Sequence, residues 1–384
     1  MLLKILFRNA FRHPLRTALT ICGMVVAVLA FGSLRTVIDA WYAGVAASSS
    51  TRLVTRNAIS LIFPLPLSYE SRIAGVEGVK TVSYGNWFGA YYVDQKNFFG
   101  NFAVQAESYL KLYPEFVVPQ AQKRAFLRDR KGALVGKKLA DRFGWKVGQT
   151  VVLIGTIYPG NWEFTIRGIY HGRDQTADET NFLFHWDYLN ETMKRTTPSR
   201  ADQVGFYMVG VKRPEDAARV AQDIDALFAN SSAETLTETE KAFQLGFVSM
   251  SEAIITAIRL VSVIIIVIIL VVCANTMAMS VRERSAEWAV FKTLGFSGAT
   301  VALVIVGESL VISCVGGGIG LALTFPLADF FRSALGQYFP IFNVSETTIL
   351  LDAGLSAAVG FLAGIFPAVS AARIPVAHAL RRVG

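Results

Sequence analysis

The chain has 384 residues, of which 53% are hydrophobic and only 17% are charged, and its mean hydropathy is +0.42. The charged fraction lies below the roughly 25% that is typical of soluble domains, and the aliphatic and aromatic content excludes a disordered chain. Three cysteines also exclude a disulfide-rich scaffold. The apolar residues are concentrated in a few long runs, which indicates an integral membrane protein.

Residues 1–16 are predicted to form a basic amphipathic helix. Its cations recur every fourth residue at Lys4, Arg8, Arg12 and Arg16, and apolar residues occupy the opposite face. A helix of this kind lies in the membrane interface, in contact with lipid, ahead of the first span.

Four stretches are predicted to cross the membrane as helices: 17–40, 251–281, 298–328 and 351–372. A helix rises about 1.5 Å per residue, so about 20 apolar residues cross the ~30 Å of hydrocarbon. A short external loop, 329–350, would join the last two spans. The third span contains a single ionisable residue, Glu308, whose role we expect to be packing or contact with a neighbouring helix rather than proton transfer.

The distribution of charge predicts the orientation. Residues 1–16, the segment 282–297 and the tail 373–384 together hold ten basic and two acidic residues, which accounts for the whole net charge of +8. Basic residues flank membrane spans on the cytoplasmic side, so both termini and 282–297 are expected inside. The charge is therefore a topology signal, and no basic face suited to nucleic acid is present.

The external segment, 41–250, has the composition of a globular α+β domain. Stretches rich in β-branched and aromatic residues predict strands over 151–157, 163–170 and 204–211. Helices are predicted over 214–228, where proline and acidic residues precede an apolar face, and over 134–143. The polar run 171–180 is expected to be an exposed loop.

Aromatic residues are concentrated between Tyr84 and Phe116, where they make up eleven of 33 residues. Two interpretations are open. The cluster fills a core and one face of a sheet, or it forms a surface for an amphiphilic cargo or a protein partner. The residues assigned to such a surface are Trp87, Phe88, Tyr91, Phe98 and Phe99.

The sequence contains no pattern that predicts catalysis, a metal site or a directly bound cofactor. The four histidines are scattered, and no group has the spacing of zinc ligands. The run 132–138 has glycines and lysines but lacks the spacing of a phosphate-binding loop. We therefore expect a non-enzymatic membrane subunit without an ATPase of its own.

Two further patterns predict contacts. Small residues let helices approach closely, so the glycines of the third and fourth spans are expected at helix interfaces; these are Gly316, Gly317, Gly318, Gly320, Gly360 and Gly364. Segment 282–297 reads RERSAEWAVFKTLGFS, with aromatic residues among charges at helical spacing and Gly295 as a stop. It is predicted to dock a cytoplasmic partner.

The sequence resembles the permease subunits of the MacB/FtsX-like, or type VII, ABC transporters. Three motifs carry the resemblance: FRNAFRHPLRTALT at 7–20, RERSAEWAVFKTLGFS followed by GESL at 307–310, and FPAVSAARIPVAHALR at 366–381. The external stretches VGKKLADRFGWKVGQTVVL and FTIRGIY are also similar to the family.

The resemblance implies a dimer of permeases driven by a separate ATPase, which would bind ATP and Mg²⁺. It assigns the contact with this ATPase to residues of the coupling segment, namely Glu283, Arg284, Glu287, Trp288, Lys292, Leu294 and Gly295. The helical spacing of the aromatic residues adds Phe291 to this set. Cargo would not pass through the spans. Closure of the dimer would instead move a stalk, from about Lys241 to Arg259, and reshape the external domain.

Three functions remain open under this resemblance. The first is export of an amphiphilic substrate with a periplasmic adaptor and an outer-membrane channel, from a bacterial inner membrane. The second is LolC/LolE-like release of lipoproteins. The third is FtsX-like signalling to a cell-wall hydrolase, although the external domain is larger than is usual for that role.

Overall fold

The protein is represented by a computed structural model, which describes residues 9–174, 177–335, 339 and 341–373. The chain divides into two compact units. One comprises Met1–Ala40, Ser251–Ala334 and Phe342–Gly384, and the other comprises Trp41–Met250 and Leu335–Ile341. Lys4 and Arg8 of the expected amphipathic helix lie outside the described residues.

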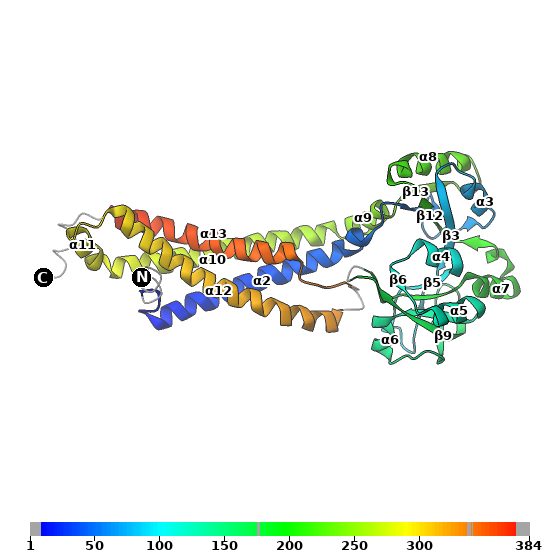
Figure 1. Cartoon of the computed structure of the whole chain (residues 1–384), viewed down its shortest axis with the longest axis horizontal. Coiled ribbons are helices and arrows are strands. Elements are labelled where there is room, and N and C mark those ends of the chain that lie inside the picture. Colours follow the sequence, from blue (N-terminus) through cyan, green and yellow to red (C-terminus); the bar gives the residue numbers. More distant parts are fainter. Residues whose placement is uncertain (1–8, 175–176, 336–338, 340, 374–384) are drawn as a thin grey trace. The chain divides into compact units, whose positions relative to one another are not determined.

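The first unit is a bundle of long helices (Figure 1): α2 (Pro14–Ala47), α10 (Glu252–Glu283), α12 (Gly298–Leu335) and α13 (Glu346–Ala372). Each of these four is long and apolar enough to span a membrane, as the sequence predicts. The short α11 (Ser285–Thr293) joins α10 to α12. Residues 11–13 form a turn, so the expected first helix does not run unbroken into the first span; proline at position 14 favours a helix start there.

The α10 helix is apolar on all sides but buries only one stripe within the chain. Its buried residues are Ile255, Ser262, Ile269, Cys273, Met277 and Val281. Val263, Ile268 and Val271 are more than half exposed. A helix that is apolar all round suits a membrane, where hydrocarbon or a second membrane helix covers the outward face.

Glycines allow the helices of the bundle to approach closely. A Cβ atom added to Gly316 or Gly320 would crowd Met24 or Val28 of α2, and one added to Gly317 would overlap the side chain of Ser356. Gly360 and Gly364 lie equally close to Ser313 and Ser309. Gly318 does not share this role, because the described residues leave open space beside it.

The second unit is built on an eleven-stranded mixed sheet. The strand order is β13-β1-β12-β3-β5-β10-β7-β9-β8-β4, with β6 paired to β9. Pairs β5–β10 and β7–β9 are parallel and the other pairs are antiparallel. The strands are β1 (Arg52–Asn57), β3 (Val79–Trp87), β4 (Ala90–Tyr91), β5 (Asn101–Val104), β6 (Phe116–Val117), β7 (Gly132–Gly136), β8 (Thr150–Gly155), β9 (Gly160–Gly172), β10 (Phe182–His185), β12 (Phe206–Val211) and β13 (Thr235–Thr239).

Short helices accompany this sheet, as expected for an α+β domain. They are α3 (Tyr69–Ala74), α4 (Ala106–Leu112), α5 (Gln120–Arg128), α6 (Lys137–Phe143), α7 (Trp186–Thr196), α8 (Ala217–Phe228) and α9 (Glu240–Met250), with 3-10 turns at Pro198–Arg200 and Pro214–Asp216. A separate pair joins β2 (Leu65–Pro66) and β11 (Gln203–Val204).

The structure differs from the sequence prediction at two elements and adds detail at a third. The helix predicted over 134–143 begins only at Lys137, because Gly132–Gly136 is a fully buried strand between β9 and β10. The run 171–180 is only partly a loop, since 171–172 belong to β9. The predicted stalk, from about Lys241 to Arg259, consists of two helices, since α9 ends at Met250 and α10 begins at Glu252.

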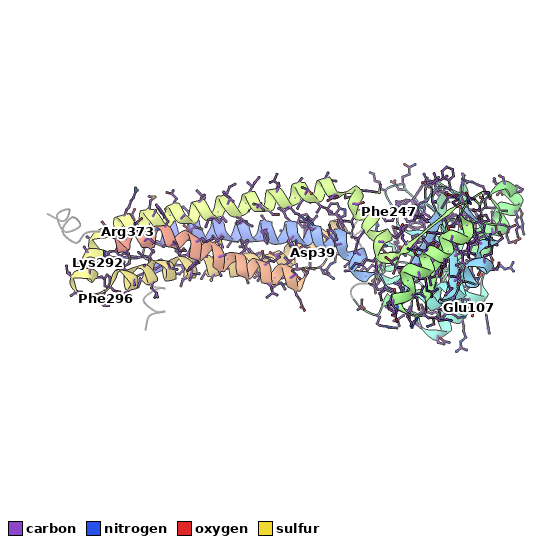
Figure 2. All side chains as sticks on the ribbon, turned by 90° about the horizontal axis from the view of Figure 1, so that it is seen from above. Asp39, Glu107, Phe247, Lys292, Phe296 and Arg373 are labelled. Carbon is purple, nitrogen blue, oxygen red and sulfur yellow. The ribbon has the colours of Figure 1, made fainter. Side chains whose placement is uncertain are left out.

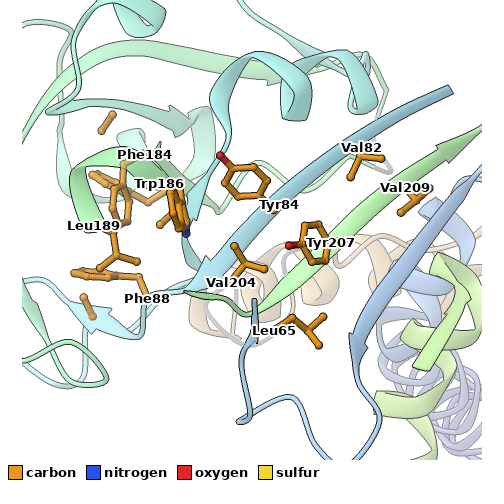
Figure 3. Close-up of a cluster of buried hydrophobic side chains, with 14 of the residues drawn as sticks. Leu65, Val82, Tyr84, Phe88, Phe184, Trp186, Leu189, Val204, Tyr207 and Val209 are labelled. Atoms are coloured by element: carbon orange, nitrogen blue, oxygen red, sulfur yellow. The ribbon is translucent and has the colours of Figure 1, made fainter. Parts of the chain in front are cut away.

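The aromatic cluster mainly forms the core of the sheet domain. Phe88 is fully buried and packs with its ring centroid 4.9 Å from that of Phe184, while Tyr84 contacts Trp186 edge-on at 5.0 Å (Figure 3). Tyr207 from β12 joins the same cluster. Phe88 and Phe99 are thus core residues, which corrects their assignment to an exposed surface.

This assignment predicts different effects for two phenylalanines of the aromatic cluster. Phe88→Ala should lower the free energy of unfolding by about 3–5 kcal/mol, because it leaves a cavity in a packed core. Phe98→Ala should cost less than about 1 kcal/mol, since the Phe98 side chain is 44% exposed. Denaturant unfolding of the purified full-length protein measures both, and equal losses would contradict the placement of Phe88.

Candidate functional site

The α11 helix lies at one end of the bundle, beside the ends of α10, α12 and α13 (Figure 1). Gly295 follows it with φ of +90° and no neighbour within 4 Å of an added Cβ. A left-handed residue of this kind ends a helix and favours glycine. Lys292, Phe296 and Arg373 lie together at this end of the bundle, while Asp39 lies towards the other (Figure 2).

Arg284 connects α10, α11 and α12 from a buried position. Its Nη1 donates to both carboxylate oxygens of Glu308 on α12, at 2.9 and 3.0 Å, and its Nε donates to Glu287 at 3.1 Å. The guanidinium carbon also lies 4.5 Å from the ring centroid of Trp288. Arg284 and Glu308 are 5% and 3% exposed, so this is a buried ion pair.

The buried pair explains the acid in the third span. A lone carboxylate in hydrocarbon is costly, and a paired, hydrogen-bonded one is tolerated. Glu308 therefore fixes α11 to the membrane helix α12, in agreement with the expected packing role.

Burial also corrects two of the predicted partner contacts. Trp288 is 2% exposed and packs with Val281, Val301 and Ile305. Arg284 is covered in the same way. Neither presents its side chain on the surface of this chain, so both hold α11 in place.

Weaker polar contacts tie α11 and its surroundings to the other helices. Arg16 of α2 forms a two-pronged pair with Glu283, with both N–O distances 2.7 Å, and Arg12 contacts Glu287. Lys292 Nζ donates to the carbonyl of Ala372, at the end of α13, at 2.8 Å. Partial burial acts to raise the pKa of Glu287, but the hydrogen bonds and charges of Arg284 and Arg12 outweigh it and lower that pKa.

An apolar patch remains on the outer side of α11. Val290, Phe291, Leu294 and Phe296 are 39–71% exposed, with Leu294 the most exposed. Glu287, Val290, Phe291 and Leu294 line a shallow depression there. The predicted coupling residues include Phe291 and Leu294 but not Val290 or Phe296. Val290 is four residues before Leu294, so helical spacing alone places the two on one face.

A second network of charges lies in the sheet domain, around the buried Arg52 of β1. Its Nε donates to Glu240, at the start of α9, at 2.8 Å, and its Nη2 pairs with Glu115 at 2.7 Å. Nη1 donates to the Leu112 carbonyl, and the guanidinium stacks on Tyr113. The backbone N–H of Ser49, just after α2, also donates to Glu240 at 2.8 Å. These bonds tie two segments to the sheet: the one that follows α2, at Ser49, and the one that precedes α10, at Glu240.

The remaining candidate residues for a partner surface differ in how far they are exposed to solvent. Trp87 and Phe98 are 42% and 44% exposed and lie 6.1 Å apart, and Tyr91 is half-buried. Asp178 does not extend into solvent: its carboxylate accepts hydrogen bonds from Thr180 and Asn181, and burial raises its pKa.

A more exposed apolar surface occupies residues 58–64, which sequence reasoning missed. Ile59 and Ile62 are 81% and 89% exposed, and Leu61 and Phe63 are 41% and 50% exposed. The loop is held in shape, because Asn57 Oδ1 accepts from the Ile59 N–H and Ser60 accepts from residues 62 and 63. β1 pairs with β13 so that Asn57 faces Thr235 and Leu53 faces Thr239. The loop therefore lies at the end of these strands opposite α9.

Comparison with known proteins identifies the family. The model of the MacB-like periplasmic core domain matches residues 17–227, more than half of the chain, and that of the FtsX-like permease C-terminal region matches residues 259–376. The chain belongs to the MacB/FtsX-like family of ABC transporter permeases. It is accordingly a multi-pass membrane protein, and membership implies a cytoplasmic ATPase partner.

Individual relatives of this permease are distant. An uncharacterised ABC transporter permease of Methanocaldococcus jannaschii is 25% identical over 407 residues, which cover 98% of this chain and 96% of the relative. The macrolide export ATP-binding/permease protein MacB of Photorhabdus laumondii is 23% identical over 61% of this chain, which spans only 36% of MacB. The periplasmic region of MacB from Actinobacillus actinomycetemcomitans aligns with 53% of this chain and 95% of its own, at 8% identity and a TM-score of 0.38.

The buried pair predicts a strong dependence of one substitution on another. Arg284→Met should destabilise the permease by about 3–5 kcal/mol, because it leaves the Glu308 charge buried and alone. Combining it with Glu308→Gln should restore most of that loss, since no uncompensated charge remains. Thermal unfolding of the purified protein measures both variants, and strictly additive losses would show that the two residues do not act as a pair.

Proposed function

We propose that this permease transmits ATP hydrolysis by a separate cytoplasmic ATPase to a conformational change in its external domain. The observation that carries the proposal is α11. Its outer side presents apolar side chains, while its polar residues are bonded to the membrane helices. Such a helix suits a docking surface whose movement is passed on to the bundle.

The contacts of α11 give this transmission a physical route. The buried Arg284–Glu308 pair makes α11 and α12 move together, because separating the charges would expose each of them to an apolar environment. The exposed pairs of Arg12 and Arg16 are weak, because water screens their charges, so they are the contacts that can break and re-form. ATP and Mg²⁺ would be bound by the ATPase, and this chain would supply only the moving parts.

The external end of the route is the Arg52 network. Glu240 begins α9, which precedes the second span, and Ser49 follows the first. Ser49 and Glu240 both belong to the hydrogen-bonded cluster around Arg52. A shift of one segment relative to the other would therefore displace β1 and, with it, the sheet. The route runs along helices and strands, in keeping with movement of the external domain rather than passage of cargo between the spans.

For the substrate, we propose export of an amphiphilic molecule with an adaptor protein. The 58–64 loop supports an adaptor, because an ordered apolar loop in water typically marks a protein interface. Its place at the end of β1 opposite α9 favours a partner beyond the external domain. We further propose a bacterial inner membrane, cytoplasmic termini, a dimer of permeases and an outer-membrane channel reached through the adaptor.

Leu294→Asp tests the docking of the ATPase. The substitution should abolish co-purification of the ATPase, because it buries a charge in an apolar contact. Folding should change by no more than about 0.5 kcal/mol, since Leu294 is 71% exposed. Leu294→Met is the matched control and should behave as wild type. Retention of the ATPase by the Asp variant, with normal coupled hydrolysis, would exclude this patch.

A single cysteine at Ile62 tests the orientation and the adaptor together. In a background that lacks the native Cys22, Cys273 and Cys314, Ile62→Cys should react with an impermeant maleimide on intact spheroplasts, and Phe296→Cys only after lysis. A photo-crosslinker at Ile62 should then capture the adaptor. Reversed labelling would invert the orientation, and failure to cross-link in cells that assemble the transporter would remove the loop as the adaptor site.

A further inference from the structure

The bundle contains a second buried acid, Asp352, in the second turn of α13. Its side chain is fully buried, and neither carboxylate oxygen has a hydrogen-bond partner among the described residues. This contrasts with Glu308, which accepts two bonds from Arg284. An unpartnered, ionised carboxylate in such a place would be strongly unfavourable.

Three membrane helices meet at Asp352. A Cβ atom added to Gly32 of α2 would lie 2.5 Å from Asp352 Oδ2 and 3.1 Å from Thr324 Oγ1 of α12. Only a glycine at position 32 leaves room for both groups. The carboxyl is therefore enclosed by α2, α12 and its own helix.

The surrounding hydroxyls have already used their hydrogens. Thr324 donates to the Gly320 carbonyl at 3.0 Å, Thr36, one turn from Gly32, donates to the Gly32 carbonyl at 2.7 Å, and Ser356 donates to the Asp352 carbonyl at 2.8 Å. A hydroxyl has one hydrogen to donate, so these groups can now only accept. Acceptors repel a carboxylate but suit a protonated carboxyl, which has a hydrogen to give.

Among the described residues of the facing helices, no cation forms an ion pair with Asp352. On α2, the Nε of Arg35 lies 3.5 Å from Asp39 without forming a hydrogen bond among the described residues, and on α12, Arg332 pairs with Asp329 at 3.0 Å. Asp39 also accepts from Ser345 and Thr348 of the α13 start. The charged residues nearest the same end of α10 and α13, namely Glu252, Arg259 and Glu346, are exposed.

We propose that Asp352 is a proton-binding site of the membrane bundle. In the packed arrangement its carboxyl carries a proton. When α2, α12 and α13 separate and admit water, the carboxyl ionises and releases this proton to the solvent at the end of the bundle where α13 begins. The carboxyl takes up a proton again when the helices close. Rearrangement of the bundle is thereby linked to the binding of one proton per chain, whatever the permease transports.

A hydrophobic carbodiimide, which reacts with protonated carboxyls in apolar surroundings, tests this site in the purified full-length permease. At neutral pH, exposed aspartates with a pKa near 3.9 are ionised and do not react. Peptide mass spectrometry should find at least about tenfold more label on Asp352 than on Glu308, because only a carboxyl that carries a proton reacts. Glu308 is the matched control, since it is equally buried but ion-paired.

Two additional readouts keep the test decisive. Labelling of Asp352 should decline when the pH is raised, and the infrared band of a protonated carboxyl should disappear in Asp352→Asn, which preserves the shape of the side chain. Absence of label on wild-type Asp352, or label on Glu308 to the same extent, would overturn the proposal. Protection of Asp352 by sodium but not by choline would also overturn it, because a metal cation would then occupy the site.

Discussion

Charge placed in an apolar environment is the constraint on which this structure depends. Arg284, between α10 and α11, satisfies it by donating from one nitrogen to both carboxylate oxygens of Glu308 on α12, and its guanidinium lies over the ring of Trp288. Removing either partner would leave the other charge buried and unpaired, so the pair holds the start of the short α11 helix against α12. A partner bound to the apolar outer side of α11 could then move α12 as well, whereas a partner bound to a flexible loop of the same composition could not.

The sheet domain uses the same solution with a different geometry. Arg52 is buried between two carboxylates, one of which begins α9. Burial alone disfavours the charged guanidinium, and the facing carboxylates Glu240 and Glu115 more than restore it, so the pKa of Arg52 is raised. The segments leading to the first two membrane helices are thus bonded to the sheet through one residue. A movement of either segment is therefore passed on to β1.

The sequence predicts those features that depend on residues close together in the chain. The spans follow from uncharged runs, and helix 217–228 from its apolar period. Helical spacing also groups Trp288 with Phe291, but it does not determine which face of α11 turns inward. That choice depends on Glu308, 24 residues beyond Arg284. Likewise the burial of Phe88 and Phe99 depends on strand β10, whose Phe184 and Phe182 lie 96 and 83 residues later, respectively. β propensity is the same for a buried and an exposed aromatic residue.

The two acids of the bundle show why composition alone cannot assign a role to a buried charge. Glu308 has a guanidinium within hydrogen-bond distance, so the charged form is compatible with burial. Asp352 meets a glycine and hydroxyls whose hydrogens are already donated, so only the neutral form fits. The difference depends on Gly32 and Thr324, which lie on two other helices. Nothing in the sequence shows that these two residues lie beside Asp352. A membrane helix can thus carry one acid as a fixed fastener and another as a group that responds to opening of the bundle, and the neighbours decide which is which.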